Sequence, residues 1–322
     1  VLKLAAEQRS FVLFGPPGTG KSYLIQRVLE ILDHPVVCAR THVAASQFDT
    51  GITLSRFKHR IQKGFFKGAL ILDELFMVEN SLLDVLAKVA LNNDFMIFAG
   101  DDAQLPPIQD TYHGNSVPPL MTSDLLKVIA PIRIELNVCK RSCSLLHDFN
   151  MLCRRESLEH CMAQARAIFQ CEGEPDISLC CDNARRKQVN QETNRRLAPE
   201  SAQLLESSDG PILLHPGLPL VGCRIAHGIL NAIWYTVESF DEHTLHLKDD
   251  RGLAISLSLE KAKSCLQLRY ALTVHKSQSK TIEGHVRLCP GKEPGHVSRY
   301  WTLRHLLVGA SRARSVKHLS IK

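Results

Sequence analysis

Short apolar runs alternate with amphipathic segments along the first part of the chain. The amphipathic segments KSYLIQRVLEIL and NSLLDVLAKVAL place apolar residues at helical spacing. The apolar runs that precede, separate and follow them are FVLFG, PVVCA, ALILDE, MIFAG and IRIEL. Strands that alternate with helices in this way predict a parallel sheet covered by helices, which is an α/β fold.

A different pattern occupies residues 212–259. Here WYTVESF, TLHLKDD and LAISLSLE indicate short strands separated by polar turns, as in a small β-barrel or meander. Beyond it, LRYALTVHKSQ and HLLVGASRARS return to a strand followed by a loop. We therefore predict two α/β domains, residues 1–135 and 136–322, the second interrupted by a small β insertion.

Composition adds little to this picture but limits the class of protein. With 44% hydrophobic and 22% charged residues, the 322-residue chain has the make-up of a globular protein with buried cores. No apolar run reaches membrane-spanning length and no signal-peptide pattern opens the chain, so we expect no membrane partner. The eleven scattered cysteines predict reduced thiols in a reducing compartment, the nucleus or cytoplasm, including that of a virus-infected host cell.

The stretch GPPGTGKS follows an apolar run and opens a helical segment, and it fits the pattern GxxxxGK[ST]. Its glycines allow backbone N–H groups to surround phosphates, and the helix N-terminus that follows favours negative charge. Lys21 is expected to reach the β- and γ-phosphates and Ser22 to bind Mg²⁺. The predicted nucleotide-binding residues are Gly15, Pro16, Pro17, Gly18, Thr19, Gly20, Lys21 and Ser22.

An acidic pair ends the apolar run ALILDEL. Asp73 is expected to hold Mg²⁺ together with Ser22, and Glu74 to polarise the attacking water. A solvated strand end has the same appearance, but the preceding phosphate loop favours the catalytic interpretation. The two motifs together predict hydrolysis of a nucleoside triphosphate, with ATP as the expected substrate.

Three further polar residues follow apolar runs. Gln104 in GDDAQLPP can sense a γ-phosphate, although a polar turn is the favoured explanation when the residue is taken alone. Arg141 in LNVCKRS and Arg312 in GASRAR are either surface charges or guanidinium groups that reach the γ-phosphate and couple hydrolysis to domain closure. The basic segment 183–197, NARRKQVNQETNRRL, predicts a helix that lines a nucleic-acid channel or presents a solvated face.

Taken in order, these motifs resemble those of superfamily-one helicases. The ordered set is GPPGTGKS, ARTHVAAS, GITLSRF, LILDEL, GDDAQLPP, LNVCKRS, ALTVHKSQSKT and VGASRAR. The pairing of TVHKSQ with GASRAR is most similar to the PIF/RecD-like branch, which includes phage and large-virus members. The resemblance runs from about residue 11 to residue 322.

The resemblance implies two RecA-like parallel-sheet domains, with a small SH3/OB-like β-barrel insertion on the second. ATP would lie between them, contacted by Lys21, Asp73, Glu74 and Gln104 of the first domain and by arginines of the second. Those arginines would be Arg141 and Arg312. Residues matching positions that touch the single strand are Thr41, His42, Thr53 and Ser55. Residues matching the motif that links the strand channel to ATP are Thr273, His275, Lys276 and Gln278.

Some positions depart from the family pattern. Gln8 lies too close to Gly15 to act as the adenine-reading glutamine, and Ser279 and Ala232 stand where the family often has glycine. A short pin-like insertion near residues 57–68 offers Phe65 and Phe66 as wedge residues or, equally, as core residues.

The function implied is an ATP-dependent DNA helicase or translocase that moves 5′→3′ on single-stranded DNA, with forked duplex DNA as a further partner. We expect a monomer or weak oligomer. Two alternatives stay open: an RNA helicase, because nothing in the motifs distinguishes ribose from deoxyribose, and a nucleic-acid-stimulated ATPase that remodels a complex without unwinding.

Overall fold

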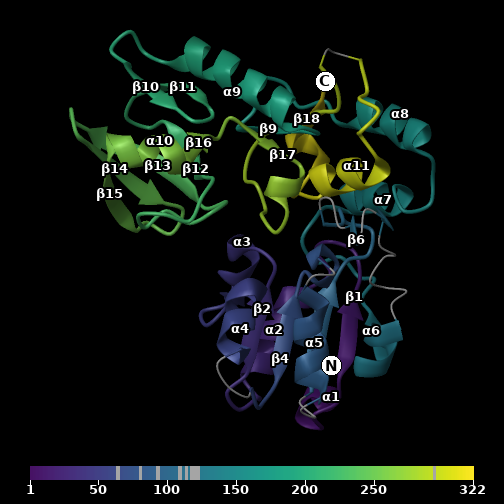
Figure 1. Cartoon of the computed structure of the whole chain (residues 1–322). Helices are drawn as coiled ribbons and strands as arrows, with labels where there is room; N and C mark the ends of the chain where they lie inside the picture. Colours follow the sequence, from purple (N-terminus) through teal and green to yellow (C-terminus); the bar gives the residue numbers. More distant parts are fainter. Residues whose placement is uncertain are drawn as a thin grey trace. The chain divides into compact units, whose positions relative to one another are not determined.

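The computed structural model describes residues 1–62, 66–79, 82–91, 95–107, 111–112, 115–116, 124–292 and 295–322. The chain forms two compact units, Val1–Arg155 and Glu156–Lys322. The first unit thus extends past the boundary that the sequence predicted between residues 135 and 136. Figure 1 labels helices and strands of both units. Each unit has its own parallel sheet, and the two are described separately.

The first unit is built on a six-stranded parallel sheet with the order β3-β2-β4-β5-β1-β8. Its strands are β1 (Phe11–Phe14), β2 (Val36–Ala39), β3 (Ile52–Thr53), β4 (Leu70–Asp73), β5 (Met96–Gly100) and β8 (Ile132–Glu135), with a separate hairpin of β6 (Thr111–Tyr112) and β7 (Asn115–Ser116). Its helices are α1 (Leu2–Ala6), α2 (Lys21–Leu29), α3 (His42–Ala45), α4 (Leu54–Ile61), the 3₁₀ turn η1 (Leu75–Met77), α5 (Leu83–Leu91), α6 (Asp124–Ile129) and α7 (Ser144–Leu152). The apolar runs predicted as strands in this part of the chain, FVLFG to IRIEL, all form strands of this sheet.

Both faces of the sheet are buried, which explains why the strand sequences are almost continuously apolar. Val12, Leu70 and Leu72 face one core, which is completed by residues of α4 and α5. Phe11 and Ile71 face the other core, which is completed by residues of α2. The sheet therefore holds its strands rigidly, and the loops at their carboxyl ends are fixed relative to one another.

The region in which a pin was expected, near residues 57–68, begins in the helix α4. Residues Leu54–Ile61 of the region form α4. Phe66 packs against the core, with its ring 5.1 Å from that of Phe57 in an edge-on arrangement. Phe66 is therefore a core residue, while Phe65 lies outside the described residues.

The second unit contains a four-stranded parallel sheet with the order β17-β9-β18-β19 and a five-stranded antiparallel sheet with the order β15-β14-β13-β12-β16. The parallel strands are β9 (Ile177–Cys180), β17 (Ala271–Thr273), β18 (Val286–Cys289) and β19 (Leu319–Ile321). The other strands are β10 (Gln203–Ser207), β11 (Gly210–Leu214), β12 (Pro219–Gly222), β13 (Trp234–Phe240), β14 (Thr244–Asp249), β15 (Ala254–Ser258) and β16 (Leu266–Leu268). The helices are α8 (Leu158–Ile168), α9 (Asn183–Leu197), α10 (Leu259–Cys265), η4 (His275–Ser277), α11 (Leu303–Ala310) and η5 (Val316–His318).

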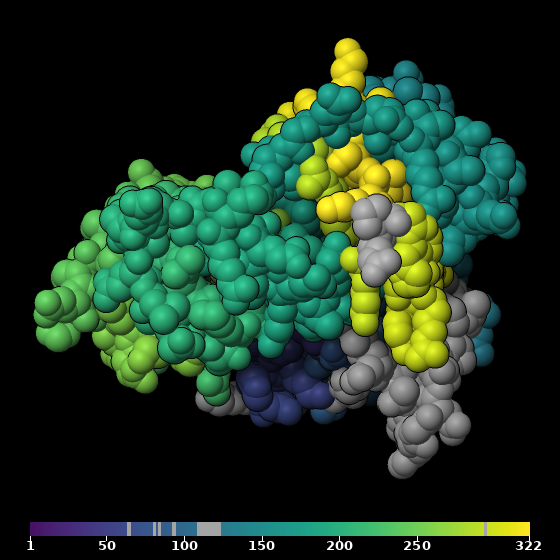
Figure 2. Space-filling view, turned by 90° about the horizontal axis from the view of Figure 1, so that it is seen from above, coloured from purple at the N-terminus to yellow at the C-terminus, as the bar shows by residue number. Residues whose placement is uncertain are grey.

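Antiparallel strands occupy the predicted insertion and extend beyond both of its expected ends, from Gln203 to Leu268. They form a lobe of their own, coloured green, at one side of the second unit (Figure 2). The alternation of buried and exposed residues along β13 and β14 matches a sheet with one solvated face. Closure of these strands into an SH3/OB-like barrel stays a prediction.

The run HLLVGA was predicted as a strand, and this was wrong, because it lies in the helix α11. Thr302 caps the helix in a capping box with His305, and residues 305–310 are all buried. A short run that is apolar on every side is compatible with a buried helix as well as with a buried strand, so periodicity could not decide.

Two residues that stand where the resembled family often has glycine adopt a left-handed backbone. The φ angle is 64° at Ala232 and 66° at Ser279. A residue with a Cβ atom is strained in this region, whereas glycine is not. The departure from the family pattern therefore leaves the backbone conformation unchanged and adds local strain.

We expect Ala232→Gly to raise the free energy of unfolding by about 0.5–1 kcal/mol, because relief of the left-handed strain outweighs the added chain entropy. Ala163, exposed within α8, is the matched control. There the same substitution should cost about 1 kcal/mol. Chemical denaturation of both variants measures the effect, and destabilisation by Ala232→Gly of the same size as the control would contradict the strain.

Candidate functional site

The loop between β1 and α2 is held in place by the chain that follows β8. A Cβ atom on Gly15 would lie 2.1 Å from the carbonyl oxygen of Leu136, so only glycine fits there. A Cβ on Gly18, whose φ is 79°, would lie 2.9 Å from Cβ of Arg141. The N–H of Lys140 also donates to the carbonyl of Gly18 at 2.8 Å. Segment 139–141 therefore packs directly on the predicted phosphate loop.

This packing corrects one expectation. Arg141 was assigned to the second domain, but it belongs to the first compact unit and lies beside Gly18. The strand β8 lies parallel to β1, and the loop that follows β8 crosses the phosphate loop.

Lys21, the first residue of α2, is folded back into its own loop. Its ammonium group donates to the carbonyl oxygens of Gly15 at 2.7 Å and Pro16 at 2.9 Å. Burial lowers the pKa of Lys21 below its usual value, although the carboxylates of Asp101, Glu74 and Asp73 act in the opposite direction. The cation is thus fixed by backbone carbonyls and surrounded by acidic groups.

Ser22 and Asp73 meet although they are 51 residues apart in the sequence. The Ser22 hydroxyl donates to Oδ2 of Asp73 at 3.3 Å, and the N–H of Glu74 donates to Oδ1 at 2.9 Å. Burial and the neighbouring Glu74 carboxylate raise the pKa of Asp73 to about 7, against the opposing effects of the Glu74 N–H, Lys21 and Ser22.

These oxygen donors fit a magnesium ion. A hydroxyl and a carboxylate are ligand types that Mg²⁺ accepts, and a divalent cation beside Asp73 would favour its ionised form. Glu74, next to this pair, has a left-handed backbone with φ 55° and ψ 43°. A non-glycine residue in this conformation is typical of strained functional sites.

The loop after β5 brings a further acidic group to the same edge of the sheet. Asp101 is fully buried and accepts hydrogen bonds from the Ala103 N–H at 3.1 Å and from Nε2 of Gln104 at 3.4 Å. A guanidinium N–H of Arg154, just beyond α7, donates to the Asp101 carboxylate, and Arg154 also lies 3.4 Å from Asp102. Gln104 is buried as well.

The sequence analysis did not identify Arg154 as a site residue. Arg155 stands beside it, and the sequence does not indicate which of two adjacent arginines points into the protein. Arg154 lies in the turn just beyond α7, so the helical spacing of that segment gives no signal for it either.

The residues predicted to touch a nucleic-acid strand in this unit lie at the neighbouring strand ends. Thr41 and Thr53 are N-caps of α3 and α4, and their side chains accept hydrogen bonds from the N–H groups of Ala44 and Arg56. His42 is half-buried, and burial together with Arg56 lowers its pKa. Ser55 is exposed on α4.

Sheet order explains how the two sets of residues are separated. The phosphate loop, Asp73 and Asp101 follow β1, β4 and β5, which are adjacent in the sheet. The Thr41 and Thr53 set follows β2 and β3 at the other end of the same edge. Because carboxyl ends of parallel strands share one edge, the residues predicted to bind nucleotide and those predicted to contact nucleic acid lie along the same edge of the sheet.

In the second unit, the motif after β17 is largely buried. The N–H of Lys276 donates to Thr273 Oγ1 at 3.3 Å, and Nζ of Lys276 donates to Gln267 at 3.2 Å. Burial lowers the pKa of Lys276 to about 8, and burial also lowers the pKa of His275. Gln278 is 3% exposed.

Arg312 joins this motif to α11. Its Nε donates to the carbonyl of Val308 at 3.0 Å, and its NH1 donates to the carbonyls of Ser277 at 3.4 Å and Lys280 at 3.0 Å. Its NH2 donates to the Ser311 hydroxyl at 2.8 Å. The side chain is buried, so the surface-charge interpretation of Arg312 is wrong.

The fold and the first unit's site define a P-loop protein in which a phosphate loop and an acidic strand end share one sheet edge. Within the described residues, each helix is too short or too polar to cross a membrane. A family model described as the viral superfamily 1 RNA helicase core domain matches residues 11–216. The chain belongs to this family of superfamily-one helicases, as its ordered motifs predicted.

Similar proteins agree with this assignment. The human ATP-dependent DNA helicase PIF1 is 26% identical over the whole of this chain, which spans 59% of the length of that relative. A solved structure concerned with DNA unwinding at forked double-stranded DNA by two coordinating Pif1 helicases has a TM-score of 0.77, 18% identity and coverage of 99% of this chain and 90% of that one. Pif1 helicase from Bacteroides in complex with ADP-AlF3 and single-stranded DNA has a TM-score of 0.75, 17% identity and coverage of 98% and 89%. The prediction of two RecA-like parallel-sheet domains is confirmed.

We expect Arg154→Ala to lower the free energy of unfolding by about 3 kcal/mol, because it leaves the buried Asp101 carboxylate without its cation. Adding Asp101→Asn should recover part of the loss, which a double-mutant cycle measures.

Arg155→Ala is the control, because Arg155 is exposed and adjacent. Equal stability of the Arg154 and Arg155 variants would show that the ion pair with Asp101 contributes nothing.

Proposed function

We propose that this chain is an ATP-dependent DNA helicase or translocase that moves 5′→3′ along single-stranded DNA. The observation that carries the proposal is the meeting of Ser22 with Asp73 beside Lys21, at the sheet edge that also carries Thr41 and Thr53. A translocase must bind both nucleotide and nucleic acid on one rigid domain. This sheet edge carries residues proposed for each of the two ligands.

In the proposed reaction, Lys21 and the loop N–H groups hold the β- and γ-phosphates. Ser22 and Asp73 hold Mg²⁺, which when bound neutralises charge that develops on the transferred phosphoryl group. Glu74 accepts a proton from the attacking water, and Gln104 orients groups near the γ-phosphate. The buried position of Asp101 and its ion pair with Arg154 keep the Gln104 loop in a single conformation.

The remaining roles follow the motif positions. Arg141 and Arg312 are proposed to stabilise the charge of the γ-phosphate during hydrolysis. Thr273, His275 and Lys276, with Thr41, His42, Thr53 and Ser55, are proposed to contact the strand, and Gln278 the nucleotide. Hydroxyl and N–H groups grip a phosphate backbone without reading sequence, which suits a translocase.

An RNA helicase is the second candidate, because the matching family model describes an RNA helicase core while the PIF1 relatives are DNA helicases. A protein distinguishes RNA from DNA through a group that contacts the 2′-hydroxyl of ribose.

Strand displacement on four substrates tests the proposal. Duplexes of DNA and of RNA, each with a 5′ or a 3′ single-stranded tail, should give ATP-dependent unwinding of 5′-tailed DNA only. Unwinding of the 3′-tailed DNA would contradict the direction, and preference for RNA would favour the second candidate. ATP hydrolysis stimulated by DNA without displacement of any strand would indicate a remodelling ATPase.

Lys21→Ala is the matched inactive variant for this assay. It should abolish hydrolysis, because no other ammonium group among the described residues of the loop can hold the phosphates. Binding of single-stranded DNA should be largely retained, as measured by fluorescence anisotropy.

For Arg312→Ala we expect a kcat for ATP hydrolysis lower by ~10³-fold, the low end for an arginine that stabilises phosphoryl transfer. Because the guanidinium also donates to three buried carbonyls, the variant's unfolding midpoint must be measured alongside. Arg314→Ala is the control, since Arg314 is exposed and pairs with exposed Glu283. A folded Arg312→Ala protein with near-normal turnover would refute the catalytic role.

A further inference from the structure

The basic segment 183–197 forms α9, and two of its arginines are buried rather than solvated. They have different environments although they are adjacent. Arg186 donates to both oxygens of Asp209, at 2.7 Å and 2.8 Å. Arg185 is 8% exposed, and its Nε atom is buried without a hydrogen-bond partner among the described residues. A buried guanidinium N–H without an acceptor has an unfavourable free energy unless an acceptor, such as an anion, approaches it.

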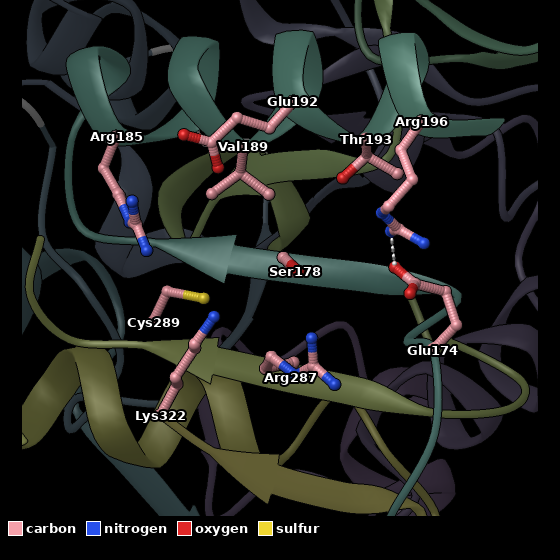
Figure 3. A pocket seen from close by; sticks show the side chains of 10 residues that line it. All are labelled: Glu174, Ser178, Arg185, Val189, Glu192, Thr193, Arg196, Arg287, Cys289 and Lys322. Carbon is pink, nitrogen blue, oxygen red and sulfur yellow. Dashed lines mark hydrogen bonds and ion pairs between the residues drawn. The ribbon is translucent and has the colours of Figure 1, made fainter. Parts of the chain in front are cut away.

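Arg185 points into a cavity of about 410 Å³ in the second unit, between α9 and the face of strands β9 and β18 (Figure 3). The lining is mostly polar, and Val189 is its one aliphatic residue among the described side chains. Arg185 extends from α9, and Lys322 from the end of β19, toward Cys289 at the end of β18 (Figure 3).

The charges around this cavity are not balanced. Of the four described cationic side chains that line it, Arg196 pairs with Glu174 at 2.6 Å. Arg287 donates to the carbonyl of Gly173 at 2.7 Å, a neutral acceptor. Arg185, Arg287 and Lys322 form no ion pair with any described residue. The remaining carboxylate, that of Glu192, accepts a hydrogen bond from Gln188 at 2.8 Å.

The thiol of Cys289 also lines the cavity. A hydrogen bond from Cys180 lowers its pKa to about 7 against the effect of burial, and Arg185, Arg287 and Lys322 add to the lowering. Arg185 and Lys322 therefore bring positive charge to the Cys289 end of the cavity, and Arg287 adds positive charge further along β18 (Figure 3).

We propose that this cavity binds a compact, multiply charged phosphate anion of the pyrophosphate class. Three cations without carboxylate partners match an anion that carries two or more negative charges. The described lining holds no aromatic ring on which a nucleobase could stack, so it recognises the phosphate groups and not a nucleoside. The site lies entirely within the second unit and uses none of the residues proposed for ATP hydrolysis.

Equilibrium dialysis with radiolabelled inorganic pyrophosphate, in EDTA, tests the proposal. The protein carries Lys21→Ala, so that the phosphate loop contributes as little binding as possible. In this background we expect one bound pyrophosphate per chain, and adding Arg185→Gln should weaken binding roughly ten- to a hundredfold. Glu192→Gln, which removes a negative charge from the lining, should tighten it.

Arg251→Gln is the control for net charge, because Arg251 is exposed and does not line the cavity. It should change binding by less than about twofold, since exposed charges are screened. Lys322→Gln, at an exposed residue, is a second test if Arg185→Gln fails to unfold cooperatively, and it too should weaken binding.

Absence of bound pyrophosphate in the Lys21→Ala protein would overturn the proposal. Binding that neither Arg185→Gln nor Lys322→Gln weakens would also overturn it. Displacement of pyrophosphate by a short oligothymidylate at lower concentration than by phosphate would assign the cavity to nucleic-acid backbone instead. None of these results depends on whether the chain hydrolyses ATP.

Discussion

The first unit depends on one buried carboxylate, that of Asp73. Asp73 ends β4 between buried strands, where an ionised acid is unfavourable unless donors or cations surround it. The parallel sheet supplies these groups, because the ends of β1 and β4 open on the same edge and bring the start of α2 to the acid. The hydroxyl of Ser22 and the N–H of Glu74 partly compensate the charge, while burial and the neighbouring Glu74 carboxylate raise the pKa of Asp73 to about 7. A magnesium ion would complete the compensation.

Much of this site was predictable from the sequence because its parts are local. The phosphate loop needs glycine at fixed positions, and an acidic pair after an apolar run, preceded by such a loop, favours the end of a buried strand. Their meeting across 51 residues then follows from the parallel order of the sheet. The residues proposed to contact nucleic acid were identified from motifs, and the structure adds that two of them, Thr41 and Thr53, cap helices.

Other features depend on tertiary contacts that no local pattern records. Arg141 stands in the first unit because the segment after β8 crosses the phosphate loop, and Arg154 meets Asp101 across a helix and a turn. The helix α11 was taken for a strand because its residues are buried on all sides. Net charge also gave no information about the arginines of α9. The adjacent Arg185 and Arg186 differ in their partners, because Arg186 pairs with Asp209 and the Nε of Arg185 has no hydrogen-bond partner among the described residues.

Two of the carbonyl groups that hold Arg312 belong to Ser277 and Lys280, and Ser279 lies between these residues in the chain with a left-handed backbone. The orientation of both carbonyls therefore depends on a backbone turn that contains a strained serine. The position of the Arg312 guanidinium is thus adjustable through the backbone conformation of a neighbouring residue. A substitution at Ser279 can alter how the arginine is held without changing the arginine itself.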